Sequence, residues 1–267
     1  MDVIEKLEER IRENTELFAK DNLEIKGNIT KTGVYLFDEV KMNFIPESFN
    51  NIIKHSNWYK RTQKKLEKYP KILEMQSSKS SDALLMNIFC YPDFINWEKP
   101  KKLLQINNYN CMKFGWNPEF SYEKKKFEYL KKLGKENEFH PSEIDLKIGD
   151  SIFEAKLTEK NFGEKEIEII QKYDGFELVF DETILKKTDN KYINYQLIRN
   201  ILVAQKYNYK FILLVDETRN DLIEYFETTK EAVKNSKLKE RIYYKTWQCI
   251  IKECEDKLSN YISKRYF

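Results

Sequence analysis

Two short runs of alternating apolar residues, separated by Gly149 and Asp150, are the strongest constraint on the fold of this chain. The runs are Ile144, Leu146 and Ile148 before the glycine, and Phe153, Ala155 and Leu157 after it. An apolar residue at every second position is typical of a strand with one buried face. Glycine supplies the positive φ that the first central position of a tight hairpin turn needs. We therefore predict a β-hairpin with Leu146 directly opposite Phe153.

The same register brings charged side chains together on the other face of the hairpin. It places Asp145 opposite Glu154, and Lys156 lies two residues further along, opposite Glu143. Side chains in such pairs are about 4.5–5.5 Å apart at Cβ, so the two carboxylates repel each other. A divalent cation bound by carboxylate oxygens removes this repulsion. The hairpin therefore predicts a metal site beside a lysine that points outward, away from the core.

The composition narrows the chemistry. The 267 residues can bury a sizeable core, in one domain or in one domain with an extension. A net charge of +3 permits an anionic partner without requiring one. Two histidines are too few for a histidine-rich metal site, and the four cysteines lack zinc-ligand spacing, which leaves carboxylate-held metal chemistry. The first ten residues form a charged amphipathic pattern and no apolar run approaches the ~20 residues of a membrane span, so we expect a soluble, cytoplasmic protein of a prokaryote.

The pattern of elements predicts an α/β (α+β) fold, with a central mixed sheet flanked by helices. Residues 1–75 are expected to form an N-terminal extension, and residues 76–267 the core. Besides the hairpin, we predict strands at 23–29, 34–40 and 209–215 and a further strand at 176–180, with residues 92–121 rich in loops. Helices are predicted at 1–20, 49–69, 81–89, 122–133 and 192–205, from 222 onward, and at 238–262.

An acid two residues before a lysine is common in this chain and is a weak signal alone. The pattern also occurs at Glu24–Lys26, Glu39–Lys41, Glu123–Lys125 and Asp189–Lys191. Glu39–Lys41 is the strongest competitor, because it ends a predicted strand and has Asp21 or Glu24 as an acidic partner. It lacks an acid directly opposite across a two-residue turn, which favours Glu154–Lys156.

Asp145, followed after eight residues by Glu154-Ala155-Lys156, resembles the motif of the PD-(D/E)xK nuclease superfamily. The segments from Glu154 to Gly163, from Tyr195 to Asn200 and from Ser80 to Phe89 are similar to one bacterial branch of that superfamily. The resemblance covers roughly residues 78–235, in patches. Ile144 stands before Asp145 where the motif has proline, which weakens recognition more than chemistry.

The resemblance implies a restriction endonuclease-like core and a set of site residues. Asp145 and Glu154 would bind Mg²⁺, with Mn²⁺ as a substitute, and the backbone carbonyl of Ala155 would complete the shell. Lys156 would orient or deprotonate the attacking water. Family members often add an acid from a preceding helix, for which we expect Glu128, with Glu74 and Glu143 as alternatives.

Two further segments are candidates for contact with nucleic acid. Gln196, Arg199 and Asn200 form one polar stripe of a predicted helix whose other face is apolar. This stripe is either an ordinary solvent face or, as the resemblance implies, lies beside the site, where Gln196 or Arg199 would touch substrate. Residues 54–68 are strongly basic with interleaved aromatic residues, so Lys60, Arg61 and Lys64 are expected to lie along phosphates or to form a solvated face.

These observations together predict a Mg²⁺-dependent nuclease, in particular a DNA endonuclease of the type II restriction or defence kind. A homodimer is expected, because cutting both strands often requires two active sites. The main alternative is a nucleic-acid-binding module that keeps the nuclease fold without cutting. A third alternative is an interaction protein organised by its terminal helices.

Overall fold

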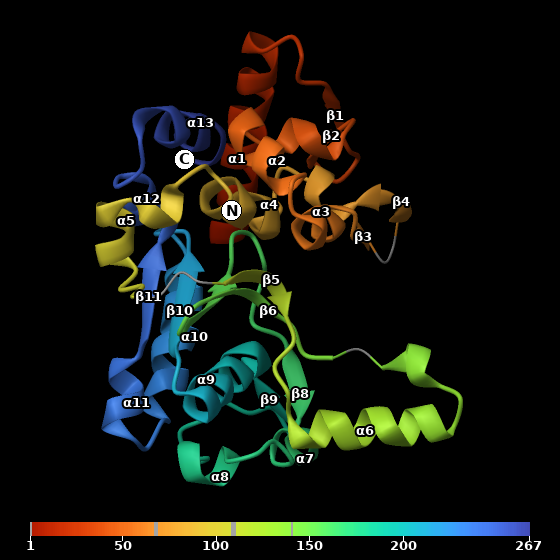
Figure 1. Ribbon diagram of the computed structural model, residues 1–267, viewed down its shortest axis with the longest axis vertical. Helices are drawn as coiled ribbons and strands as arrows, with labels where there is room; N and C mark the ends of the chain where they lie inside the picture. The colour runs from red at the N-terminus through yellow and green to blue at the C-terminus, as the bar shows by residue number, and fades with distance from the viewer. Residues whose placement is uncertain (1, 67–68, 108–110, 140) are drawn as a thin grey trace.

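The centre of the protein is a five-stranded mixed sheet (Figure 1). The structure, a computed structural model, describes residues 2–66, 69–107, 111–139 and 141–267. From edge to edge, the strands are β11 (Ile242–Thr246), β10 (Lys210–Val215), β7 (Ser151–Ala155), β6 (Ile144–Ile148) and β5 (Met112–Trp116). Strand β10 is parallel to β7 and β11, whereas β6 is antiparallel to β5 and β7. The predicted hairpin is confirmed: Leu146 pairs with Phe153, and Gly149 has a φ of 53°.

Helices cover both faces of the sheet. On one side α9 (Tyr195–Tyr207) and α10 (Asn220–Glu231) pack in a cluster with Ile152. On the other side α4 (Ser81–Phe89), α12 (Trp247–Ile251) and α13 (Asp256–Tyr266) pack in a cluster with Phe153. The predicted fold class is thus confirmed. All five residues of β7 are buried, so the prediction of a strand with one exposed face is wrong for β7, because helices cover it from both sides.

Both edge strands lie where the sequence predicts other structure. Strand β5 falls in the segment expected to be loop-rich, and β11 interrupts the helix expected at 238–262. That region instead forms α11 (Ser236–Glu240), β11, α12 and α13. The Ile-Tyr-Tyr start of β11 has high strand propensity and pairs along β10. The strand expected at 176–180 is wrong as well, because Phe176–Val179 forms the short helix α8.

The N-terminal part adds helices and two small hairpins. Helix α1 (Val3–Asp21) is confirmed, and β1 (Gly27–Ile29) and β2 (Tyr35–Phe37) are shorter than predicted. The prediction of one helix at 49–69 is wrong. The region forms two helices, α2 (Pro46–Ile52) and α3 (Ser56–Thr62), followed by two strands, β3 (Lys65–Leu66) and β4 (Tyr69–Leu73). Phe49 and Trp58 pack on one hydrophobic cluster, yet nine residues are about two and a half helical turns. One straight helix would place them on opposite sides, so the chain bends between them.

The N-terminal part packs against the end of the chain. Helix α1 packs against α13 (Figure 1), and Leu7 and Ile11 belong to the same hydrophobic cluster as Phe153. The boundary expected at residue 75 stays a prediction. All four cysteines are free. No helix in the described part of the chain combines the length and the apolar character needed to span a membrane.

The remaining elements are short, apart from α6, which extends sideways from the body of the protein (Figure 1). They are α5 (Glu98–Leu103), α6 (Ser121–Lys132), β8 (Glu164–Glu166), α7 (Ile167–Ile170), β9 (Lys191–Ile193) and the 3₁₀ turns Val40–Asn43, Glu74–Gln76, Phe94–Asn96 and Glu136–Glu138.

Candidate active site

A charged cavity of about 460 Å³ lies where β6 and β7 meet α3, α4 and α9. Its walls include Arg61, Asp82, Asp145, Lys156 and Arg199. Asp145, Ala155 and Lys156 line this cavity, whereas Glu154 lies outside the lining. Their roles in metal binding and catalysis remain predictions.

Lys156, which lines this cavity, forms a buried ion pair with Glu154. Glu154 Oε1 lies 2.8 Å from Lys156 Nζ, and only 1% and 7% of these side chains are exposed. The prediction that Lys156 points outward is wrong, because α9 covers this side of β7. Burial alone would lower the pKa of Lys156, but the carboxylates of Glu154, Glu159 and Asp145 outweigh it and raise this pKa. Lys156 is therefore a protonated donor in this arrangement.

Helix α9 supplies the other partners of Glu154. Arg199 Nη2 lies 3.3 Å from Glu154 Oε2, and Asn200 Nδ2 donates to the same oxygen at 2.7 Å. Burial raises the pKa of Glu154, but Lys156 and Arg199 outweigh it, so the pKa lies below its usual value. Arg199 and Asn200 are both buried, so they form no solvent face. Gln196, one turn earlier, lines the cavity.

Asp145 leaves the β-ladder and bonds to the backbone of β7. The pairing of β6 with β7 ends at Leu146 and Phe153, and Asp145 Oδ2 accepts a hydrogen bond from the N–H of Ala155 at 2.8 Å. The departure coincides with a twist in β5 at Gly115, whose φ of 61° lies in the left-handed region. Burial, followed by the charges of Glu154 and Asp82, raises the pKa of Asp145 well above its usual value, against the opposing effects of Lys156 and Arg61. The two acids of the motif therefore differ: Glu154 holds its charge readily and Asp145 does not.

Arg61 reaches into the cavity from α3. Its Nη2 lies 2.8 Å from Asp82 Oδ1 and 3.7 Å from Asp145 Oδ1, and its Nη1 pairs with Glu143. Its side chain is only 8% exposed. Arg61 is thus paired with carboxylates in the interior, which differs from the exposed phosphate contact that a basic helix predicts.

The other basic residues of this segment stay nearer the surface. Lys64 lines the cavity and pairs with Glu74 at 3.2 Å, whereas Lys60 is exposed on α3 outside the cavity lining. The structure therefore does not place Lys60, Arg61 and Lys64 along one basic face.

The structure does not bring Glu128 to the site. Glu128 is exposed on α6 and lines a different hollow, together with Lys124 and Lys132. The expected acid from a preceding helix has a better counterpart in Asp82, in the first turn of α4. The sequence predicts this helix at 81–89 but the prediction did not select Asp82. The signal in the sequence is an acid in the first turn, two residues after the capping Ser80 and ahead of a mostly apolar run. The alternatives Glu74 and Glu143 both line the cavity.

The segment that follows Lys156 is held by buried hydrogen bonds that the sequence did not reveal. Trp247 Nε1 donates to the carbonyl of Lys156 at 2.9 Å, and the N–H of Lys156 donates to Leu214. Glu159 accepts hydrogen bonds from Ser81 Oγ at 2.5 Å and from the N–H of Leu157 at 2.6 Å. These contacts fix the backbone around Lys156 and tie it to the start of α4.

The oxygen donors at this cavity are of the type that binds a divalent cation. Asp82, Asp145 and Glu154 offer the hard oxygens that Mg²⁺ prefers. Glu154 Oε1 is buried with Lys156 Nζ 2.8 Å away, so a cation would share this oxygen with Lys156. In the described part of the chain, no three His, Cys, Asp or Glu side chains are arranged to hold a metal. The residue types fit, but Arg61 Nη2 stands between Asp82 and Asp145.

The mixed sheet and the acid–lysine cluster at its centre define a protein of restriction endonuclease-like architecture. Residues 12–267 match the family described as restriction endonuclease associating with ARP, and the chain belongs to this family. No curated protein and no solved structure matches the chain.

Proposed function

We propose that this protein is a Mg²⁺-dependent DNA endonuclease of the PD-(D/E)xK superfamily, of the type II restriction or defence kind. Membership of a restriction endonuclease family supports a nuclease of restriction type. The observation that carries the finer proposal is that Lys156, buried in an ion pair with Glu154, lines the same charged cavity as Asp145. A buried, intact acid–lysine pair has little value for a fold that only needs stability, because burying charges is costly.

In this proposal the acids hold the cation and Lys156 acts on the reacting groups. Asp145, Glu154 Oε1 and Asp82 would bind Mg²⁺, with the Ala155 carbonyl as a further ligand and Mn²⁺ as a substitute. Bound Mg²⁺ would activate water and stabilise charge on the phosphate. Protonated Lys156 would donate a hydrogen bond to the attacking water or to a phosphate oxygen. Arg199 and Asn200 would orient Glu154, and Gln196 would contact the substrate.

A second candidate function has one observation in its favour. Arg61, Lys156 and Arg199 already neutralise the acids, as in a module that binds nucleic acid without metal. Cleavage of supercoiled plasmid in Mg²⁺, with EDTA as control, separates the two functions. We expect Mg²⁺-dependent nicking or linearisation that Glu154→Gln abolishes; DNA binding without any cleavage would support the binding module.

The proposal extends to assembly and location. Cutting both strands of a duplex often uses two active sites, so we propose a homodimer on DNA in a prokaryotic cytoplasm. Sedimentation with and without duplex DNA measures the oligomeric state directly.

A further inference from the structure

A single guanidinium fills the space between the acids of the candidate metal site. Nη2 of Arg61 contacts both Asp82 and Asp145, and Nη1 pairs with Glu143. The two contacts of Nη2 span α4 and β6, the elements that supply the hard oxygens. The positive charge of Arg61 therefore occupies the position between carboxylates that a cation would take.

The surroundings leave room for this arginine. A Cβ at Gly115 would collide with Arg61 Nη1 and Glu143 Oε1, so the glycine of β5 provides the space through which Arg61 reaches the acids. Helix α3 is fixed on the same strand, because the rings of Trp58 and Phe114 pack at 5.6 Å. Arg61 lies on α3, which belongs to the N-terminal part, and the packing of α3 on β5 positions it.

We infer that Arg61 is the resident counter-ion of Asp82 and Asp145 and competes with the divalent cation for them. The inference rests on the proposed function. When a cation binds, Nη2 must leave both carboxylates, and Glu143 near the cavity mouth remains as a partner for Nη1. The affinity of the site for metal is then set in part by α3, a segment outside the hairpin motif.

The test is Mn²⁺ binding without DNA, measured by electron paramagnetic resonance and calorimetry. Removing one positive charge from the ligand cluster in Arg61→Gln should tighten Mn²⁺ binding by about tenfold or more, a change that corresponds to about 1.4 kcal/mol. Arg61→Lys keeps the charge and should bind Mn²⁺ much like the unmodified protein. Lys60→Gln, one residue earlier and outside the cavity, is the matched control and should change nothing.

The thermal stability of the same proteins provides a check on folding. Arg61→Gln leaves three carboxylates without their shared partner, so its Tm should fall without metal and recover more on adding Mn²⁺ than that of the unmodified protein. Equal or weaker Mn²⁺ binding by folded Arg61→Gln would overturn the competition while leaving metal dependence intact. If the unmodified protein and all variants bind no Mn²⁺, both this inference and the Mg²⁺-dependent function fail.

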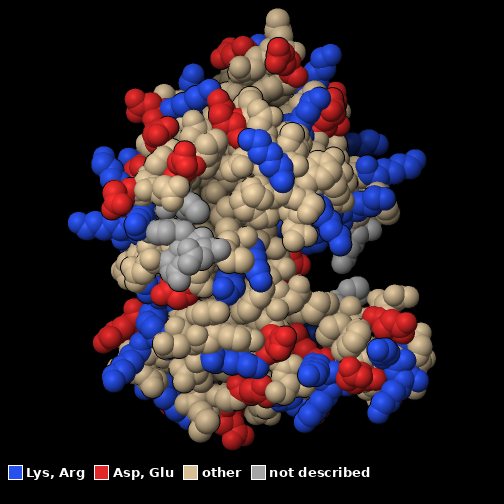
Figure 2. Space-filling model, viewed as in Figure 1, with Lys and Arg blue, Asp and Glu red and all other residues tan. Residues whose placement is uncertain are grey.

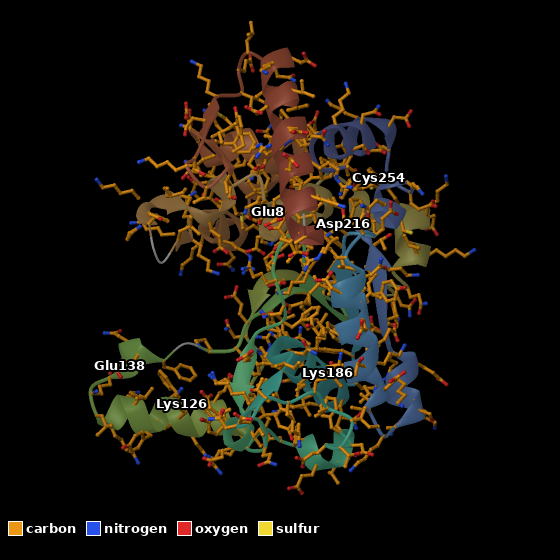
Figure 3. All side chains as sticks on the ribbon, turned by 180° about the vertical axis from the view of Figure 1, so that it is seen from behind. Glu8, Lys126, Glu138, Lys186, Asp216 and Cys254 are labelled. Carbon is orange, nitrogen blue, oxygen red and sulfur yellow. The ribbon has the colours of Figure 1, made fainter. Side chains whose placement is uncertain are left out.

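A separate observation concerns α6, the helix that stands away from the body. Its exposed lysines are Lys124, Lys125, Lys126, Lys131 and Lys132. Five lysines against two glutamates give this helix a net charge equal to the +3 of the whole chain. Within the described ranges, the structure gives none of these lysines an ion-pair partner. Figure 3 shows Lys126 on this helical arm and Glu138 in the 3₁₀ turn that follows it, both remote from Asp216 in the body.

The arm is rooted at the rim of the active-site cavity. Glu123 in its first turn is buried and accepts hydrogen bonds from Ser142 and, at 3.0 Å, from the hydroxyl of Tyr173. Ser142 precedes Glu143, and its Oγ lies 2.9 Å from the hydroxyl of Tyr195; both Ser142 and Tyr195 line the cavity. Figure 2 shows an indentation of the surface between this arm and the N-terminal part, with basic side chains on the N-terminal part and both basic and acidic side chains on the arm.

We propose that α6 binds the phosphate backbone of duplex DNA whose cleavage site lies in the cavity. This second proposal also rests on the proposed function. Twelve helical residues extend about 18 Å, which matches the rise of about five base pairs. Unpaired lysines on an exposed helix neutralise phosphates without reading sequence.

The test is the salt dependence of duplex binding in EDTA, where no cleavage occurs. Replacing Lys124, Lys125 and Lys132 by Gln should reduce the slope of log affinity against log salt by about 2.7 if each lysine neutralises one phosphate. The control replaces Lys31, Lys237 and Lys252, three exposed lysines outside α6, and should retain the slope. Equal slopes for the two triple variants would overturn the role of α6 alone. No binding of duplex by any form would overturn both this role and a DNA substrate.

Discussion

Two of the Glu-x-Lys segments in the chain, Glu39–Lys41 and Glu154–Lys156, lie in opposite environments in the structure. Glu39 and Lys41 form an ion pair at 2.9 Å, but their side chains are 56% and 55% exposed at a 3₁₀ turn. Glu154 and Lys156 form a pair of nearly equal length, 2.8 Å, that is almost fully buried. The same tripeptide pattern is therefore a solvated surface feature in one place and a desolvated charge cluster in the other. The difference lies in what surrounds each pair, not in the pair itself.

Catalysis should show the largest difference between the two pairs. Lys156→Ala should reduce Mg²⁺-dependent plasmid cleavage by about 10²-fold or more, because a positioned proton donor or acceptor contributes this much. Lys41→Ala should leave cleavage unchanged. Lys156→Arg should not restore activity, since a guanidinium is bulkier and differs in donor geometry. Initial cleavage rates under single-turnover conditions measure all three variants. Loss of activity in Lys41→Ala with normal cleavage by Lys156→Ala would move the active site to the N-terminal segment.

The second-largest difference between the Glu39–Lys41 and Glu154–Lys156 pairs should be in the free energy of unfolding. Removing the Glu154 carboxylate leaves Lys156 and Arg199 buried without their shared partner, so Glu154→Ala should cost roughly 3–5 kcal/mol of unfolding free energy. Glu39→Ala should change it by less than about 0.5 kcal/mol, as is usual for exposed positions. Urea denaturation without metal measures both. Two opposed acids without other partners would repel each other, and removing one of them would then stabilise the protein. The expected loss of stability in Glu154→Ala is the opposite of that result. A small change for Glu154→Ala would mean that Arg199 and Lys156 find other partners.

The hairpin and its acids could be predicted from the sequence because they follow local rules. Alternating apolar residues and a Gly-Asp turn determine the register of β6 and β7 without reference to the rest of the chain. The burial of Lys156 and Arg199 depends on α9 crossing β7, which no local pattern encodes. Arg61 is a stronger example: it lies 84 residues before Asp145 in the sequence, on a helix whose end was predicted incorrectly. The contacts that hold Arg61 in place join residues far apart in the sequence, and sequence periodicity does not predict such contacts.

The pH dependence of stability should distinguish the two acids within the buried site. The pKa of Glu154 is lowered, so its ionisation stabilises the fold above the usual glutamate pKa and this contribution is lost as the pH falls. The pKa of Asp145 is raised, so its protonated form stabilises the fold. This stabilisation is fully present below the usual aspartate pKa and is lost as the pH rises through the raised pKa of Asp145 in the folded protein. At neutral pH, Glu154→Gln should therefore be less stable and Asp145→Asn more stable than the unmodified protein. Urea denaturation in EDTA from pH 3 to pH 8 measures both differences, which should shrink toward acid.

The smallest difference between the two pairs should be in the salt dependence of their coupling energies. This dependence reports directly whether each pair is exposed to solvent. Mobile ions screen exposed charges over a Debye length of about 10 Å at 0.1 M and 3 Å at 1 M, but they do not enter a buried cluster. The coupling energy between Glu39 and Lys41 in a double-mutant cycle should start at only about 0.2–1 kcal/mol and decline toward zero as NaCl rises. The coupling between Glu154 and Lys156 should stay nearly constant over the same range, because α9 excludes solvent from it. A coupling at Glu154–Lys156 that fell with salt would show that water and ions reach the pair, and the desolvated cluster would then no longer explain its chemistry.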